Sequence, residues 1–169
     1  MYQERYWKEL YQLKVHLNYL ELYLQRSEII DRYLNIFLAI SSSSSIAGWA
    51  IWQSGAIVWA IIIALSQVIN VIKNLLPFKT RMKSLSGIAN EFGEIDIYAE
   101  QKWFDVSEGK LTEEEIHNLQ FSIRQKKTKS LKKHLGNCTL PENSILMSKA
   151  QKATDIYFNN FYSVENENA

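Results

Sequence analysis

Residues 33–72 have the sequence YLNIFLAISSSSSIAGWAIWQSGAIVWAIIIALSQVINVI, and this stretch decides the fold. It contains no Asp, Glu, Lys, Arg or His residue. A helix rises about 1.5 Å per residue, so about 20 residues cross a hydrocarbon core that is about 30 Å thick. We therefore expect two transmembrane helices, at residues 33–53 and 56–76, with Gln53-Ser54-Gly55 as the turn between them. The alternative is a buried hairpin in a soluble protein, but its helices would normally carry a charged stripe.

Basic residues flank the uncharged stretch and predict its orientation. Arg32 precedes it, and four basic residues follow it: Lys73, Lys79, Arg81 and Lys83. Basic residues stay on the cytoplasmic side, so we expect both termini in the cytoplasm and the turn outside. Trp residues near the turn suit the outer headgroup level: Trp49, Trp52 and Trp59. The expected location is therefore a cell membrane, with a multi-pass topology.

The sequence outside this stretch is polar, charged and periodic. Only two Pro and six Gly residues occur among 169 residues, which is typical of an almost wholly helical protein. Charges fill the first 32 residues, so we expect no signal peptide and expect the first span to direct its own insertion. The single Cys138 excludes an internal disulfide. The predicted fold is an all-α membrane protein: a two-helix transmembrane hairpin with a cytoplasmic helical module formed by the flanking amphipathic helices.

Residues 1–32 are expected to form a cytoplasmic amphipathic helix. Its apolar residues recur at spacings of three and four: Tyr6, Leu10, Leu13, Leu17, Leu20 and Leu24. No Pro or Gly interrupts the chain before Arg32, so this helix can continue into the first span as one rod. The apolar face either packs against the helix that follows the membrane, which we favour, or forms an oligomerisation surface.

Residues 78–135 are expected to form further cytoplasmic helices after Pro77. The first covers residues 79–105, and residues 107–109 break it. Residues 112–115, Thr-Glu-Glu-Glu, form a capping box with Thr112 as N-cap and Glu115 at N3, and so predict where the next helix begins. In the segment 136–169 we expect a break, a last helix at residues 142–163 and a frayed end.

A basic stretch lies within the second of these helices: Arg124, Lys126, Lys127, Lys129, Lys132 and Lys133. The simplest interpretation is a solvated helix face or linker. Attraction to anionic lipid of the inner leaflet is the next alternative, because the module would be tethered at that surface. Nucleic acid is the least favoured partner, because aromatic residues do not alternate with the basic ones.

Small residues recur at every fourth position in both predicted spans. These candidate helix-packing residues are Ala39, Ser43, Ala47, Gly48, Ala56, Ala60 and Ala64. Small side chains at this spacing let helix backbones approach closely. The two ridges therefore either pack the hairpin against itself or pack several copies against one another.

Polar residues within the spans are candidates for lining a pore: Ser41, Ser42, Ser45, Ser66, Gln67 and Asn70. Asn35 lies at a depth comparable to Asn70, so amides of the two helices can also serve each other as interhelical hydrogen-bond partners. The other interpretation is a strip that meets water when several copies assemble. No Asp, Glu, Lys, Arg or His residue lies within residues 33–72, so we expect neither a proton relay nor a voltage sensor.

No catalytic, cofactor-binding or metal-binding pattern is visible in the sequence. The three His residues are scattered, no His, Cys, Asp or Glu spacing suits a metal, and Gly-rich phosphate loops are missing. The consecutive residues Glu113 to Glu115 are explained by the electrostatics of a helix start. We therefore expect a protein that is not an enzyme and has no cofactor.

Three features together match a known layout: a cytoplasmic helix at residues 4–31, the hairpin segments FLAISSSSSIAGWAIW and AIVWAIIIALSQVINVIKNLL, and the following segment KTRMKSLSGIANEFGEIDIYAEQKWFDVSEGKLTEEEI. Over residues 1–127 this layout resembles the SLATT group, two-helix membrane effectors of bacterial antiphage defence islands. The resemblance implies an inner-membrane homo-oligomer that forms a pore or disrupts the membrane and so causes abortive infection. It also implies a nucleotide-signal synthase or another sensor encoded nearby. The alternatives are a non-pore membrane anchor or scaffold for a cytoplasmic partner, and a small holin-like toxin.

Overall fold

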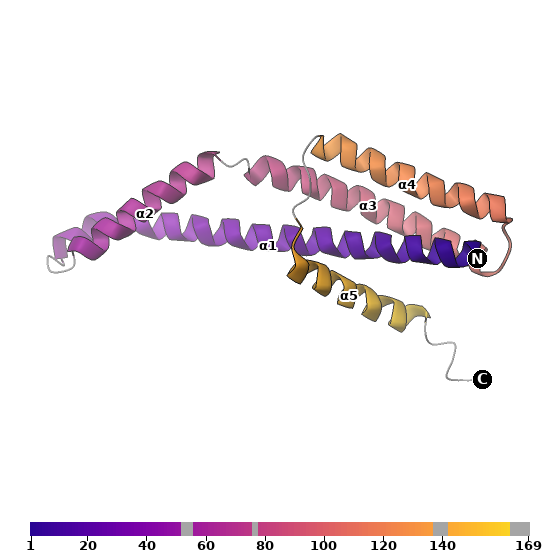
Figure 1. The fold of residues 1–169 in the computed structure, drawn as a ribbon. Coiled ribbons are helices and arrows are strands. Elements are labelled where there is room, and N and C mark those ends of the chain that lie inside the picture. The colour runs from indigo at the N-terminus through magenta and orange to yellow at the C-terminus, as the bar shows by residue number, and fades with distance from the viewer. Residues whose placement is uncertain (52–55, 76–77, 137–141, 163–169) are drawn as a thin grey trace. The chain divides into compact units, whose positions relative to one another are not determined.

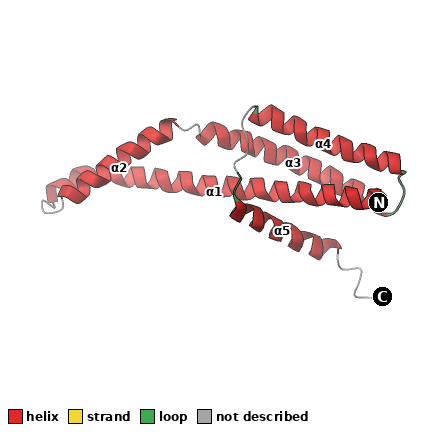
Figure 2. Cartoon of the chain, in the orientation of Figure 1, coloured by secondary structure: helices red, strands yellow, loops and turns green. Residues whose placement is uncertain are grey.

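The computed structural model describes residues 1–51, 56–75, 78–136 and 142–162. Its elements are α1 (Tyr2–Ile51), α2 (Ala56–Leu75), α3 (Phe78–Ser107), α4 (Glu113–Leu135) and α5 (Ser144–Tyr162) (Figure 1). The described residues contain no strand, which confirms the predicted all-α class (Figure 2).

Among the residues that the structure describes, no helix combines the length and the apolar character needed to cross a membrane.

The chain packs as two units. Unit 1 consists of residues 1–24 and 83–169, and unit 2 consists of residues 25–82. Helix α1 contributes its first half to unit 1 and its second half to unit 2, and it runs from Tyr2 to Ile51 as a single helix. The absence of Pro and Gly before Arg32 predicted this continuity.

Unit 1 has a core built on the first half of α1. The predicted apolar series of this half is buried at Tyr6, Leu10, Leu13, Leu17 and Leu20, and its last member, Leu24, is partly buried against the same core. They share one core with residues of the three other helices of unit 1: Leu85, Ile88, Phe92, Ile95, Ala99, Ile116, Ile123 and Phe158. Each Leu, Ile or Phe side chain among them contributes about 1.5–3 kcal/mol when it is fully buried. The apolar face of α1 therefore has an intramolecular partner, which was the favoured alternative.

The start and the end of α4 follow the local sequence signals. The hydroxyl of Thr112 accepts a hydrogen bond from the Glu115 amide at 3.3 Å, and the Glu115 carboxylate accepts one from the Thr112 amide at 2.8 Å. This confirms the predicted capping box. The helix ends before Gly136, whose φ of 57° lies in the left-handed region that favours glycine. The predicted last helix is α5, and the predicted frayed end after it lies outside the described residues.

Part of the basic stretch of α4 holds unit 1 together. Arg124 and Lys127 contact the buried carboxylate of Glu9 at 2.8 and 3.0 Å. Burial alone would raise the pKa of Glu9, but the hydrogen bonds from these two cations lower it. Lys129 and Lys132 are exposed, as a solvated helix face requires.

Candidate functional site

Unit 2 is an antiparallel pair made of the second half of α1 and of α2 (Figure 1). The less exposed positions of α2 recur at spacings of three and four: Trp59, Ile62, Ser66, Ile69 and Lys73. The less exposed positions of α1 include a matching series: Asp31, Leu34, Leu38 and Ser41. This spacing places each series on one helix face, so the two series form the seam of the pair.

A polar cluster closes the seam near the C-terminal end of α2. The Lys73 ammonium lies 3.4 Å from the Asp31 carboxylate and also donates a hydrogen bond to the side-chain oxygen of Asn35. The Asn35 amide in turn donates to Asp31 at 2.9 Å. From the sequence, an amide of α2 was a possible hydrogen-bond partner of Asn35. In the structure, Asn35 instead bonds to Asp31 and Lys73. The spacing of Asp31 and Asn35, one helical turn apart, was the available signal.

The structure separates the polar residues that were predicted to line a pore. Ser41 is buried on the seam, and Ser66 lies on the seam with its hydroxyl donating to the Ile63 carbonyl at 2.8 Å. Gln67 and Asn70 are exposed on the outer surface of α2. Ser42 and Ser45 lie outside the residues whose side chains are described. Only the two amides therefore face outward among the candidates that the structure places.

The small residues of α2 also face outward. Ala60 and Ala64 are exposed, so α2 turns this ridge away from the seam with α1. Ala39 of α1 likewise occupies an exposed position. The side chains of Ser43, Ala47, Gly48 and Ala56 lie outside the described residues. Ala60 and Ala64 are thus accessible to contacts beyond the pair.

Large apolar side chains cover the outer surface of unit 2. In α2 they are Ile57, Val58, Ile61, Ile63, Leu65, Val68, Val71 and Ile72, with 37% to 78% of each residue exposed. In α1 they are Ile29, Ile30, Tyr33, Ile36 and Ile40. Monomeric soluble proteins rarely expose contiguous apolar surfaces larger than a few hundred Å². The outer surface of unit 2 therefore fits an apolar environment better than water.

No family model, no curated protein and no solved structure matches this chain.

Proposed function

We propose that unit 2 inserts into the bacterial inner membrane as a two-helix hairpin, and that several copies assemble into a pore or lesion that dissipates the membrane potential. In this proposal the protein is a SLATT-like effector of abortive infection, activated by a sensor or nucleotide-signal synthase encoded nearby. The observation that carries the proposal is the apolar outer surface of unit 2, interrupted by the outward amides of Gln67 and Asn70.

Lipid provides the environment that this surface requires. Exposed residues such as Ile57 and Val68 would exchange water for hydrocarbon, at a gain of up to about 1.5–3 kcal/mol for each side chain. Helices suit this environment because their backbone groups are bonded internally. The basic residues after α2 favour a cytoplasmic location for both termini. The side chains of residues 42–56 lie outside the described ones.

Assembly of several copies follows from the outward face of α2. Ala60, Ala64 and Gln67 are spaced by four and three residues, so they lie on one face of the helix. The alanines permit close approach of another helix, and the amide needs a polar partner or water once it is in hydrocarbon. Two helices cannot enclose a channel, so a pore requires several copies. An uncharged lining discriminates weakly between ions, so we expect a weakly selective leak.

The experiment compares the full chain with the double variant Gln67→Leu/Asn70→Leu and with the matched control Val68→Leu/Val71→Leu. All three are overexpressed in bacteria together with their neighbouring genes, so that an encoded activator is present, and two quantities are measured in the same cells: protein in urea-washed membranes and membrane potential from a dye. We expect the unaltered chain and the control to insert and to depolarise the cells. The amide variant is expected to insert equally well, because its helix is more apolar, but not to depolarise.

Each other outcome has a defined meaning. A chain recovered in the soluble fraction would overturn the membrane proposal. An amide variant that accumulates normally and still depolarises cells would show that these amides do not line the path. Membrane insertion without depolarisation by the unaltered chain would favour the anchor or scaffold alternative.

A further inference from the structure

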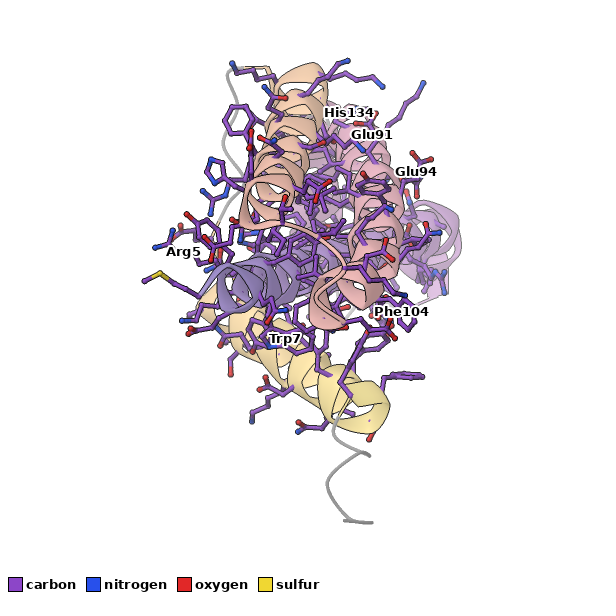
Figure 3. The ribbon with its side chains drawn as sticks, turned by 90° about the vertical axis from the view of Figure 1, so that its right-hand side faces the viewer. Arg5, Trp7, Glu91, Glu94, Phe104 and His134 are labelled. Carbon is purple, nitrogen blue, oxygen red and sulfur yellow. The ribbon has the colours of Figure 1, made fainter. Side chains whose placement is uncertain are left out.

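Unit 1 contains a groove of about 740 Å³ between the N-terminal turns of α1 and the C-terminal turns of α3 and α5. Its walls carry five aromatic residues: Trp7, Trp103, Phe104, Phe161 and Tyr162. Figure 3 shows Trp7 between α1 and α5, and Phe104 on α3 at the same end of the unit. Pockets for small molecules usually measure about 300–1,000 Å³, so the groove has the size of a ligand site.

Some of the aromatic rings that line the groove pack against one another, and others are exposed to solvent. The ring of Trp7 lies 4.8 Å from that of Trp103 and 5.3 Å from that of Tyr162, measured between centroids. Phe104 and Phe161, in contrast, are 57% and 69% exposed. Exposed aromatic faces carry the negative side of the ring quadrupole, and they attract cations within about 6 Å.

The two charged side chains that line the groove are both acidic, and each has an ammonium group beside it: Lys14 lies 3.9 Å from Glu100, and Lys110 lies 2.6 Å from Glu108. Among the described side chains, no basic residue lines the groove itself. The hydroxyls of Tyr157 and Tyr162 both donate to one oxygen of Glu100 at 2.7 Å, which fixes that carboxylate in place. Burial, followed by this contact with Glu100, raises the pKa of both tyrosines, so they remain neutral donors. An occupant of the groove therefore meets aromatic faces together with two carboxylates.

The chain itself already places a cation at the rim. The ammonium of Lys110 lies 4.6 Å from the centroid of Phe104 and 2.6 Å from the carboxylate of Glu108. An alkylammonium group thus contacts an aromatic face and a carboxylate at once. Lys14 of α1 likewise lies 3.9 Å from the Glu100 carboxylate and 3.9 Å from the ring centroid of Tyr157, so the same combination recurs at Glu100.

We propose that this groove binds a small free organic cation, an alkylammonium or quaternary ammonium compound, between the aromatic faces and the two carboxylates. A cation attached to a phosphate, as in a lipid headgroup, is disfavoured because Glu100 and Glu108 repel the phosphate. The proposal is independent of the membrane activity, since every residue that carries it belongs to unit 1.

The test uses the full chain in maltoside micelles, with ¹⁵N-labelled indole groups that are assigned by single Trp→Phe changes. Choline is titrated against its neutral isostere 3,3-dimethylbutan-1-ol, and phosphocholine is the third probe. Choline is expected to shift the Trp7 and Trp103 signals saturably and to leave the signal of Trp59, in unit 2, unchanged. It should act at concentrations on the order of tenfold lower than the neutral isostere and lower than phosphocholine.

Three variants sharpen the test. Glu108→Gln should weaken choline binding, whereas the matched control Glu114→Gln, on an exposed residue outside the groove, should not. Lys110→Met should strengthen binding, because it removes the internal ammonium that competes for Phe104 and Glu108. Unshifted signals of the remaining Trp residues verify folding. Equal affinity for choline and its neutral isostere, or equal affinity of the Glu108 variant and the unaltered chain, would overturn the proposal. Tighter binding of phosphocholine would assign the groove to a lipid headgroup instead of a free cation.

Discussion

The imidazole ring of His134 lies where a side chain at residue 87 would project, since a Cβ atom added to Gly87 would lie 2.5 Å from Cε1 of His134. Glu91 holds the same ring, because its carboxylate lies 2.9 Å from Nε2 of His134. Figure 3 shows Glu91 and His134 pointing toward each other between α3 and α4. The start of α3 and the end of α4 can approach closely here because residue 87 has no side chain.

The first prediction is that the effect of Gly87→Ala on stability depends on whether His134 is present. Alanine favours a helix interior by about 1 kcal/mol over glycine, but here it must displace His134 from Glu91. We expect Gly87→Ala to be neutral or destabilising in the unaltered chain, and stabilising by about 1 kcal/mol after His134→Ala. The stability of four chains is measured by thermal unfolding in detergent: the unaltered chain, the two single variants and the double variant. Equal effects in both backgrounds would show that the imidazole does not restrict residue 87.

The second prediction concerns acid stability. Hydrogen bonds from Lys133 and His134 hold the pKa of Glu91 at about 2, below its ordinary value of 4.5. A carboxyl group with a lowered pKa in the folded state stabilises the protein at pH values above 4.5, and this contribution is lost as the pH falls from 4.5 toward 2. Glu91→Gln should therefore be less stable than the unaltered chain at pH 7, and the difference should vanish near pH 2. Glu94→Gln, an exposed neighbour on α3, is the control that should show no such convergence.

The third prediction concerns the ion pair between Lys14 and Asp96. Their charged atoms lie 2.6 Å apart, and the side chain of Asp96 is only 4% exposed. Lys14→Met leaves a buried carboxylate without its counter-charge, so we expect a loss of about 3–5 kcal/mol in the free energy of unfolding. Replacing Asp96 by Leu in the same chain should restore part of this loss. Lys8→Met removes an equally short but exposed pair with Glu4 and should cost less than about 1 kcal/mol.

The fourth prediction separates contacts within one hairpin from contacts between hairpins. Ala60 faces away from α1, so Ala60→Leu should leave the pair folded but hinder close packing of copies. Val58→Leu adds bulk at another exposed position of α2 and serves as the control. Cross-linking in native membranes should yield oligomers for the unaltered chain and for the control, and fewer for Ala60→Leu. If the unaltered chain depolarises cells but cross-linking finds only monomers, the proposed assembly is contradicted.

The sequence predicted the helices well because their signals are local. Thr112 and Glu115 lie three residues apart and determine where α4 begins, and Gly136 determines where it ends. The spacing of Leu10, Leu13 and Leu17 likewise identified the buried face of α1. Each of these signals involves residues that are neighbours along one helix, so the periodicity of that helix is sufficient to find them.

The partners across helices could not be predicted in the same way. Periodicity shows that a face is apolar, but not which other helix covers it. The aromatic groove brings together Trp7, Trp103 and Tyr162 from three helices, and no pattern along the chain connects them. The small residues of α2 have the spacing of an interface, yet the seam runs through Trp59, Ile62 and Ser66 instead.

The division of unit 1 into two separate segments imposes an order on biosynthesis. Residues 1–24 leave the ribosome before residues 25–82, while the α3 residues that cover them, such as Leu85 and Ile88, follow only afterwards. At about 5–20 residues per second, this delay is on the order of 3–12 seconds. During this interval the leucines of the nascent α1 are uncovered, so another apolar surface, such as that of a chaperone, would have to shield them. In a chain that stops after Met82, these leucines would stay uncovered, so we expect rapid proteolysis of such fragments.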